Sequence, residues 1–488
     1  MSLPRAFTAF SGATAVSMAA QLIRGKFAAL FLGPAGVGIF NQLALTWNLF
    51  QLAGQLGSFN GIVQHGADAL ADDDQPQLLR LVSTSTLLLG GVSCMLALAG
   101  AIAAAPVSDL VLHDGGRHAA LVRLLMLAVP FAVTAQTYRA LLSAARAVPQ
   151  LVRNQIISDV GSAIVFGVLV VPFGLGGAIL GFMTAHLILF VAGLLSARRV
   201  LRQALMPRWT YFRWSIVRSN VGFGASGLVM FATTNVSVLL VSRILIARFG
   251  LEANGIFSNA WRIASVYLGA ITATTISYLV PTFTRARDSS DMSRDLNSAL
   301  AFFLALLPPV MTGIMATGEL IVPIVLSAKF SPVAPLLLLF VPAELFRVLA
   351  ETMTIPLLAR RKMVPFTLLY LAQASIFVAG AALLIPSFGM AGAAVAYGVS
   401  TVSGAVIDGG AAFIITRARI RRDTWMLGSS AVVLLASVAS LCHWLPLGLS
   451  RFALSTLLLG LWFAVNTRSV EFMSLLRGGF RSMTKLVM

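Results

Sequence analysis

Long apolar stretches recur along the whole chain and are separated by short polar segments. Each stretch is roughly 20 residues or longer, enough for an α-helix to cross a hydrocarbon core about 30 Å thick. The stretches do not alternate between apolar and polar residues, so they predict helices and not the strands of a membrane barrel. We place fourteen spans, at residues 8–31, 37–64, 79–104, 120–142, 153–171, 174–196, 217–247, 254–282, 297–318, 332–358, 363–385, 389–415, 425–445 and 447–465.

The composition agrees with a membrane protein. Hydrophobic residues make up 58% of the chain and charged residues 11%, whereas a soluble chain carries about 25% charged residues. The segments between the spans are too short to fold a soluble catalytic domain, which disfavours membrane glycosyltransferases and polysaccharide polymerases or ligases. We therefore expect a transporter and not an enzyme.

The basic residues show how the spans are oriented. The chain has 35 Lys and Arg against 17 Asp and Glu, a net charge of +18. Most of the basic residues, Arg139 and Arg361 among them, fall in the terminal segments or after even-numbered spans. Few, such as Arg117 and Arg451, follow odd-numbered spans. By the positive-inside rule, both termini are expected to be cytoplasmic, in a bacterial inner membrane. The same rule accounts for the net charge without a nucleic-acid partner.

Two halves of the chain resemble each other. Residues 32–42 (LGPAGVGIFNQ) match residues 249–259 (FGLEANGIFSN) at an offset of 217, and FGLGGA at 173–178 matches FGMAGA at 388–393 at an offset of 215. The offset covers six spans, an even number, so both halves have the same topology. This predicts lobes related by a pseudo-twofold axis along the membrane normal, with a binding site between them.

The repeat divides the chain into three parts. Residues 1–208 form the first six-helix lobe and residues 209–423 the second. Residues 424–488 add two helices and a cytoplasmic tail. The added pair is expected to be either a structural appendage or a surface for lipid or a partner.

Polar side chains mark one face of span 37–64 and the equivalent face of span 254–282. They recur at i, i+7 and i+14, which places them on one side of a helix. Because both halves carry them, we expect a hydrated central cavity. The residues are Asn41, Asn48 and Gln55 in the first half and Ser258, Ser265 and Thr272 in the second.

Five basic residues within predicted spans are candidates for a binding role, because an ionised side chain there costs at least ~2.5 kcal/mol and normally faces water or a partner. Lys26 and Arg243 are equivalent in the repeat, and Arg262 lies on the polar face. Snorkelling to the headgroups is the alternative for Arg24 and Arg243. A cavity richer in cations than anions suits phosphate. The candidate substrate-binding residues are Lys26, Arg243, Arg262, Arg24 and Arg347.

Acidic residues gather in span 332–358. Glu344, Arg347 and Glu351 lie within about 60° on a helix wheel. They are either titratable groups that couple transport to a proton or sodium gradient, or an intrahelical ion pair. Asp408 is a further candidate for ion coupling. No group of residues has metal-ligand spacing, so neither a metal nor a cofactor is expected.

Four segments carry a family resemblance: GKFAALFLGPAGVGIFNQ (25–42), SFNGIVQHGAD (58–68), ANGIFSNAWRIASVYLGAITATTISYLVPTFTRAR (253–287) and LSAKFSPV (326–333). They resemble the Wzx-type flippases for polysaccharide repeat units, including O-antigen and lipid III flippases. These belong to the multidrug/oligosaccharidyl-lipid/polysaccharide exporter superfamily. The resemblance covers about residues 1–420.

The resemblance implies two six-helix lobes around a cationic lumen that work by alternating access. The expected function is movement of an undecaprenyl-diphosphate-linked repeat unit, of O-antigen, exopolysaccharide or common antigen, from the cytoplasmic to the periplasmic leaflet. Expected partners are this lipid-linked oligosaccharide, membrane lipids and polysaccharide polymerase or assembly proteins. Such flippases typically have twelve helices, whereas fourteen are typical of lipid II flippases. The alternatives are therefore a lipid II-type flippase, a multidrug or cation exporter on the same fold, and a non-transporting membrane scaffold.

Overall fold

A computed structural model describes residues 3–201, 207–266, 268, 279, 282–286 and 288–467 of the 488-residue chain. Within these ranges every regular element is a helix and there is no strand. The helices divide into two compact units, Met1–Gly255 and Ile256–Met488. The predicted all-helical membrane fold is therefore confirmed for the described residues. The predicted boundaries at 208/209 and 423/424 stay predictions.

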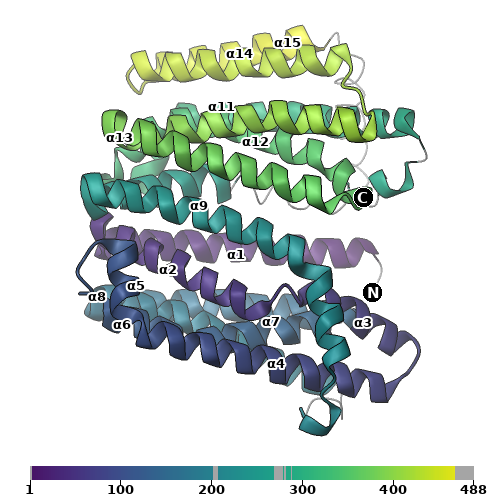
Figure 1. The fold of residues 1–488 in the computed structure, drawn as a ribbon. Coiled ribbons are helices and arrows are strands. Elements are labelled where there is room, and N and C mark those ends of the chain that lie inside the picture. The colour runs from purple at the N-terminus through teal and green to yellow at the C-terminus, as the bar shows by residue number, and fades with distance from the viewer. Residues whose placement is uncertain are drawn as a thin grey trace. The chain divides into compact units, whose positions relative to one another are not determined.

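In the part that the structure describes, the N-terminal unit, purple to teal in Figure 1, holds eight α-helices and most of a ninth. The long helix α9 begins in this unit and ends in the next. The helices are α1 (Leu3–Phe31), α2 (Gly33–Gln55), α3 (Phe59–Ala71), α4 (Gln75–Ile102), α5 (Ala104–Leu112), α6 (Ala119–Met126), α7 (Val129–Ala144), α8 (Val148–Leu201) and α9 (Trp214–Trp261).

Among its described residues, the C-terminal unit, teal-green to yellow in Figure 1, holds the end of α9 and five further α-helices. Directly after α9 the chain forms a π-helical turn, Arg262–Val266. Such turns are rare and are often found at functional sites. The five helices are α11 (Ser289–Val325), α12 (Val333–Ala359), α13 (Met363–Thr416), α14 (Arg422–Trp444) and α15 (Leu449–Asn466).

Among the described residues, nine helical segments are long and apolar enough to cross a membrane. Two of them, α8 and α13, have 54 residues each and would be roughly 80 Å long if straight. That is more than twice the thickness of a hydrocarbon core. Each is broken by a non-helical glycine, Gly174 in α8 and Gly389 in α13. Each therefore provides two spans, as the sequence predicts.

Two predicted spans are interrupted. Span 37–64 breaks after α2, where Leu56 and Gly57 have φ angles of 49° and 68°. The chain turns there and continues as α3. Span 120–142 is divided between α6 and α7. The sequence does not reveal the break after α2, because Leu56 and Gly57 interrupt the helix but not the run of apolar residues.

The internal repeat is visible in the backbone. Gly174 and Gly389 have φ angles of 51° and 56°, and Arg146 and Arg361 have 50° and 56°. Both pairs are 215 residues apart, the offset of the FGLGGA and FGMAGA segments. A positive φ is uncommon for a residue such as Arg, so two matched pairs indicate that the two halves share local conformations.

Two repeat copies also contact each other within the N-terminal unit. A Cβ atom at Gly38 of α2 would lie 2.2 Å from the Leu251 carbonyl oxygen of α9, and one at Gly255 would lie 1.9 Å from the Pro34 carbonyl oxygen. The amide of Asn254 donates to the Gly38 carbonyl oxygen at 3.1 Å. Only glycine permits this backbone approach.

The last helix pair packs within the C-terminal unit. The Asn297 side chain of α11 accepts hydrogen bonds from the Arg421 backbone and from the Thr424 hydroxyl, each at 2.7 Å. Arg451 of α15, 1% exposed, donates to Glu319 of α11 at 2.8 Å. Arg451 therefore lies inside a helix, as predicted span 447–465 implies, and is buried, so it does not belong with the loop residues that orient the chain.

Candidate functional site

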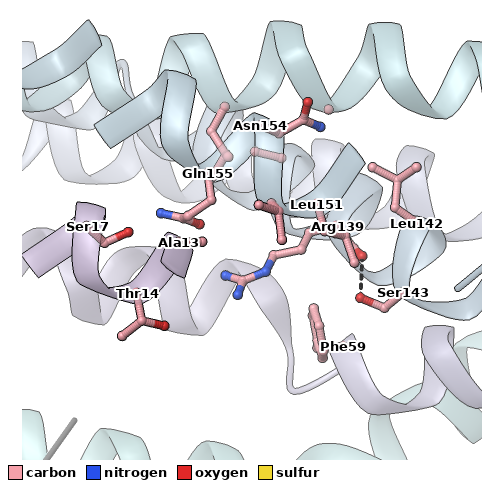
Figure 2. A pocket seen from close by; sticks show the side chains of 14 residues that line it. Ala13, Thr14, Ser17, Phe59, Arg139, Leu142, Ser143, Leu151, Asn154 and Gln155 are labelled. Atoms are coloured by element: carbon pink, nitrogen blue, oxygen red, sulfur yellow. Dashed lines mark hydrogen bonds between the residues drawn. The ribbon is translucent and has the colours of Figure 1, made fainter. Parts of the chain in front are cut away.

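A polar cavity of about 430 Å³ lies inside the N-terminal unit, between α1, α3, α7 and α8. Arg139 of α7 extends into it (Figure 2) and is exposed. Neutral hydrogen-bonding side chains surround the guanidinium group, and no acidic residue is among the lining residues. The polar residues of the lining are Thr14, Ser17, Arg139, Ser143, Asn154 and Gln155.

A buried carboxylate adjoins this cavity. Asp159 of α8 is 7% exposed and accepts hydrogen bonds from Ser17 of α1 and, at 2.8 Å, from Gln155. Further along the same contact between α1 and α8, Arg24 donates to the Ser162 hydroxyl at 3.1 Å. The site therefore combines an accessible cation with an acid held by neutral donors.

Sequence reasoning missed both charged residues of this site. The loop-charge pattern assigns Arg139 to the basic residues that orient the chain, but it lies inside α7. Asp159 is an ionisable residue within predicted span 153–171, so the criterion that selected Glu344 would also have selected it. Its contact with α1, whose described part carries no acid, could not be foreseen because the two helices are far apart in the sequence.

The other predicted residues of the N-terminal unit do not line this cavity. Lys26 is half-buried on α1 and Arg243 is half-buried on α9. In the polar stripe of α2, Asn41 is buried while Asn48 and Gln55 are half-buried. The stripe is present, but its role as a lumen face stays a prediction.

A second polar cluster lies in the C-terminal unit. Glu344 of α12 is 0% exposed and accepts hydrogen bonds from Ser265 at 2.5 Å, from Arg347 at 2.6 Å and from the Tyr397 hydroxyl. Arg347 also donates to Glu351. The ion pair predicted by the helix wheel therefore exists, with both glutamates on one arginine.

Aromatic rings cover this carboxylate. Tyr397 lies 4.6 Å from Trp261, 5.5 Å from Phe377 and 5.7 Å from Phe340, measured between ring centroids. Such close ring contacts leave little room for water. Glu344 is therefore shielded from solvent, whereas the side chains of Arg347 and Glu351 are 19% and 26% exposed.

Asp408 of α13 is 3% exposed. One of its oxygens accepts a hydrogen bond from Gln373 at 3.3 Å, and the other has no partner among the described atoms. Ser258 and Arg262 are half-buried in the same unit. Thr272 lies outside the described residues.

Solved structures with the same fold support this architecture. The chain is similar to the lipid II flippase MurJ in an inward closed conformation, with 13% identity over 96% of this chain and 99% of that chain and a TM-score of 0.73. It is also similar to an inward-facing multidrug resistance MATE family transporter of the MOP superfamily, with 14% identity, coverage of 85% and 96%, and a TM-score of 0.68.

Curated relatives are similar in sequence as well. The lipid III flippases of Escherichia coli (strain K12) and Shigella flexneri are each 29% identical over 406 residues, which is 81% of this chain and 95% of theirs. A family model described as polysaccharide biosynthesis protein matches residues 28–335, more than half of the chain. The chain is a multi-pass bacterial inner-membrane protein and belongs to the polysaccharide biosynthesis protein family.

Proposed function

We propose that this protein is a flippase that moves a polyprenyl-diphosphate-linked oligosaccharide from the cytoplasmic to the periplasmic leaflet by alternating access. The observation that carries the proposal is the accessible Arg139 in a polar cavity of about 430 Å³. This volume is within the range of small-molecule sites, about 300–1,000 Å³. Arg binds phosphate through a forked pair of donors, and the neutral side chains around it suit sugar hydroxyls.

The names of the curated relatives support the substrate class, since both are lipid III flippases. We propose that Arg139 acts with Lys26 and Arg243, the cations related by the repeat. Arg24 and Arg262 are further candidates. In this structure Arg347 is engaged by two glutamates, so it could meet substrate only after those pairs open.

The acidic cluster is proposed to couple transport to an ion gradient. Glu344 and Glu351 share Arg347, which leaves that group with an excess of one negative charge if both are ionised. Asp408 adds a further buried carboxylate, whose hydrogen-bond donor is the neutral Gln373. Buried excess charge is costly in a membrane protein, so the cluster favours uptake of a proton or a sodium ion. Because Glu344 is 0% exposed, an ion can reach this carboxylate only after a conformational change.

A cation exporter is the second candidate, and one observation favours it. Asp159 places a carboxylate against α1, the region where an exporter of cations needs an acid. The substrates distinguish the two functions: a strain without this gene would become sensitive to cationic drugs if the protein exports cations, and would lose surface polysaccharide if it is a flippase.

The site assignment is tested by complementation of a strain that lacks its own flippase. Wild-type protein is expected to restore surface polysaccharide, and the double variant Lys26→Ala plus Arg243→Ala is expected to fail at equal membrane expression. If this variant restores polysaccharide as well as wild type does, those two residues do not bind the substrate. The same experiment with Arg139→Ala tests the cavity separately.

A further inference from the structure

A further polar cavity, of about 480 Å³, lies in the C-terminal unit. It lies where α11 and α14 end and where α12 and α15 begin, so the helix pair beyond the repeat forms part of its wall. Both connections at this end follow odd-numbered predicted spans, so the positive-inside rule predicts that the cavity lies at the periplasmic end. The lining residues whose side chains carry nitrogen or oxygen are Glu319, Ser331, His443 and Arg451.

A buried arginine fixes the one carboxylate of this cavity. The Arg451 side chain is 2% exposed and donates to one Glu319 oxygen at 2.8 Å and to the Met315 carbonyl oxygen at 3.3 Å. The Glu319 side chain, by contrast, is 46% exposed. A carboxylate has two oxygens and about four lone-pair sites, so the ion pair leaves most of its accepting capacity for a ligand. The cavity therefore presents an oriented acceptor, and Arg451 acts as a positioning residue through Glu319.

The charge balance of the lining indicates the class of ligand. With His443 neutral, Arg451 is the one cation of the lining and Glu319 the one anion, so the wall carries no net charge. An anionic group such as phosphate would be repelled by the exposed Glu319 carboxylate. A cationic group would meet a carboxylate whose charge Arg451 already offsets. Neutral hydroxyl groups avoid both costs, because they donate to a carboxylate and exchange hydrogen bonds with an imidazole or another hydroxyl.

The rest of the lining suits the carbon skeleton of a sugar. Val322, Pro335 and Leu338 supply apolar surface against which the C–H face of a sugar ring can pack. Small-molecule sites generally combine such surface with a few placed polar groups. The His443 ring also contacts that of Trp444, with centroids 5.1 Å apart, and Trp444 is 81% exposed. An indole combines an apolar face with a polar N–H group, which matches the two kinds of surface on a sugar.

We propose that this cavity binds a neutral sugar unit, with Glu319 as the acceptor for its hydroxyl groups. Ser331, from the LSAKFSPV segment, and His443 complete the polar contacts. The site shares no lining residue with the Arg139 cavity. Two sources supply such a sugar: a lipid-linked oligosaccharide and a free saccharide. The first source rests on the proposed function, whereas the sugar site itself does not.

Saturation-transfer NMR tests the site on the full-length protein in nanodiscs. The probes are three neutral disaccharides, cellobiose, maltose and lactose, with cellobiouronic acid and the disaccharide of glucosamine as charged analogues. We expect at least one neutral probe to bind more tightly than both charged analogues. Glu319→Gln should weaken that binding about tenfold, because an amide oxygen is a weaker acceptor than a carboxylate but can still bond Arg451. The matched control Asp423→Asn removes an exposed carboxylate of α14 that lies outside the lining, and it should leave binding unchanged.

A second variant makes the test independent of the ion pair. Ser331→Trp places an indole at the cavity without changing its charge and should abolish binding, whereas Ala328→Trp, at an exposed position outside the lining, should not. The inference is wrong if no neutral probe binds, if a charged analogue binds more tightly, or if Glu319→Gln and Ser331→Trp both bind as wild type does. Binding that is lost in Arg139→Ala but complete in Ser331→Trp would place the sugar in the other cavity and would also overturn it.

An undecaprenyl-diphosphate-linked oligosaccharide in the same nanodisc distinguishes the two sources. Displacement of the disaccharide would identify the lipid-linked oligosaccharide as the ligand, and no displacement would identify a free saccharide; both results support the sugar site. Translocation in proteoliposomes separates this inference from the proposed function. Wild-type protein that binds the disaccharide but moves no lipid-linked oligosaccharide would refute the flippase proposal alone. Wild-type protein that translocates but binds no neutral probe would refute the sugar site alone.

Discussion

The two halves of the molecule share backbone features but differ in their polar interiors. In the N-terminal unit Arg139 is accessible in a cavity whose lining residues include no acid, and the adjoining Asp159 carboxylate interacts with it electrostatically. In the C-terminal unit Glu344 is fully buried, bonded to Arg347 and covered by aromatic rings. The two halves therefore share the glycines at which a long helix kinks, Gly174 and Gly389. Their polar side chains differ, and one half has an accessible cation while the other has a buried acid.

One pair of equivalent positions illustrates the difference between the two polar interiors. At the offset of 215, Tyr397 corresponds to Phe182. The Tyr397 hydroxyl donates to Glu344, whereas Phe182 packs against Trp47 with ring centroids 5.0 Å apart. At this position the two halves differ by a single hydroxyl group. In the C-terminal half the hydroxyl donates to a carboxylate, and in the N-terminal half the ring without it makes an apolar contact.

The largest effect is expected from removing the buried cation. Arg347→Ala leaves Glu344 without a counter-charge at 0% exposure, and breaking such a buried pair costs about 3–5 kcal/mol. Thermal unfolding in detergent should show a strong loss of stability. Adding Glu344→Gln should recover most of it, because the uncompensated charge disappears. If the double variant is no more stable than Arg347→Ala, the charge pairing is not what stabilises the cluster.

The accessible cation should behave in the opposite way. Arg139→Ala is expected to leave the unfolding temperature nearly unchanged, since the side chain is exposed. Losing charged hydrogen bonds to a diphosphate, about 1.5–3 kcal/mol, should slow translocation by between about 10-fold and 150-fold. Arg139→Lys should retain part of the rate. A stability loss comparable with that of Arg347→Ala would contradict the contrast between the two sites.

The shared backbone predicts matched effects. Gly174→Ala and Gly389→Ala both place a Cβ atom on a residue with positive φ, which costs about 1–3 kcal/mol. Unfolding measurements should give similar losses for the two variants. A loss at only one of the two positions would show that the repeat is not conserved in its energetic role.

The smallest effect is expected at Asp159. Asp159→Asn keeps an oxygen that can accept the bonds from Ser17 and Gln155, so translocation of a lipid-linked oligosaccharide should change by less than about twofold. Uptake of a cationic dye into vesicles is the companion measurement. Abolished dye transport in Asp159→Asn, with wild type active, would favour the cation exporter.

Much of the fold follows from the sequence because hydrophobic length and loop charge act locally. The kinks at Gly174 and Gly389 fall where the repeat places them, and the helix wheel brings Glu344, Arg347 and Glu351 together. These features depend on neighbours within a few turns of one helix.

The remaining features depend on which helices pack together. Asp159 meets Ser17 across 142 residues of sequence, and Tyr397 meets Glu344 across 53. No periodicity within one helix reports such contacts. Arg139 lies inside predicted span 120–142, so its position could have singled it out, but only the packing of α1, α3 and α8 around it creates the cavity.

The central claim is that an accessible arginine in the N-terminal unit binds the diphosphate of a lipid-linked oligosaccharide during translocation. The most direct measurement uses proteoliposomes that carry a fluorescent undecaprenyl-diphosphate-linked oligosaccharide, with an impermeant quencher added outside. Wild-type protein should expose the inner-leaflet lipid to the quencher at least about tenfold faster than Arg139→Ala. Exposure by wild-type vesicles no faster than by protein-free vesicles, or equal rates for both proteins, would contradict the claim.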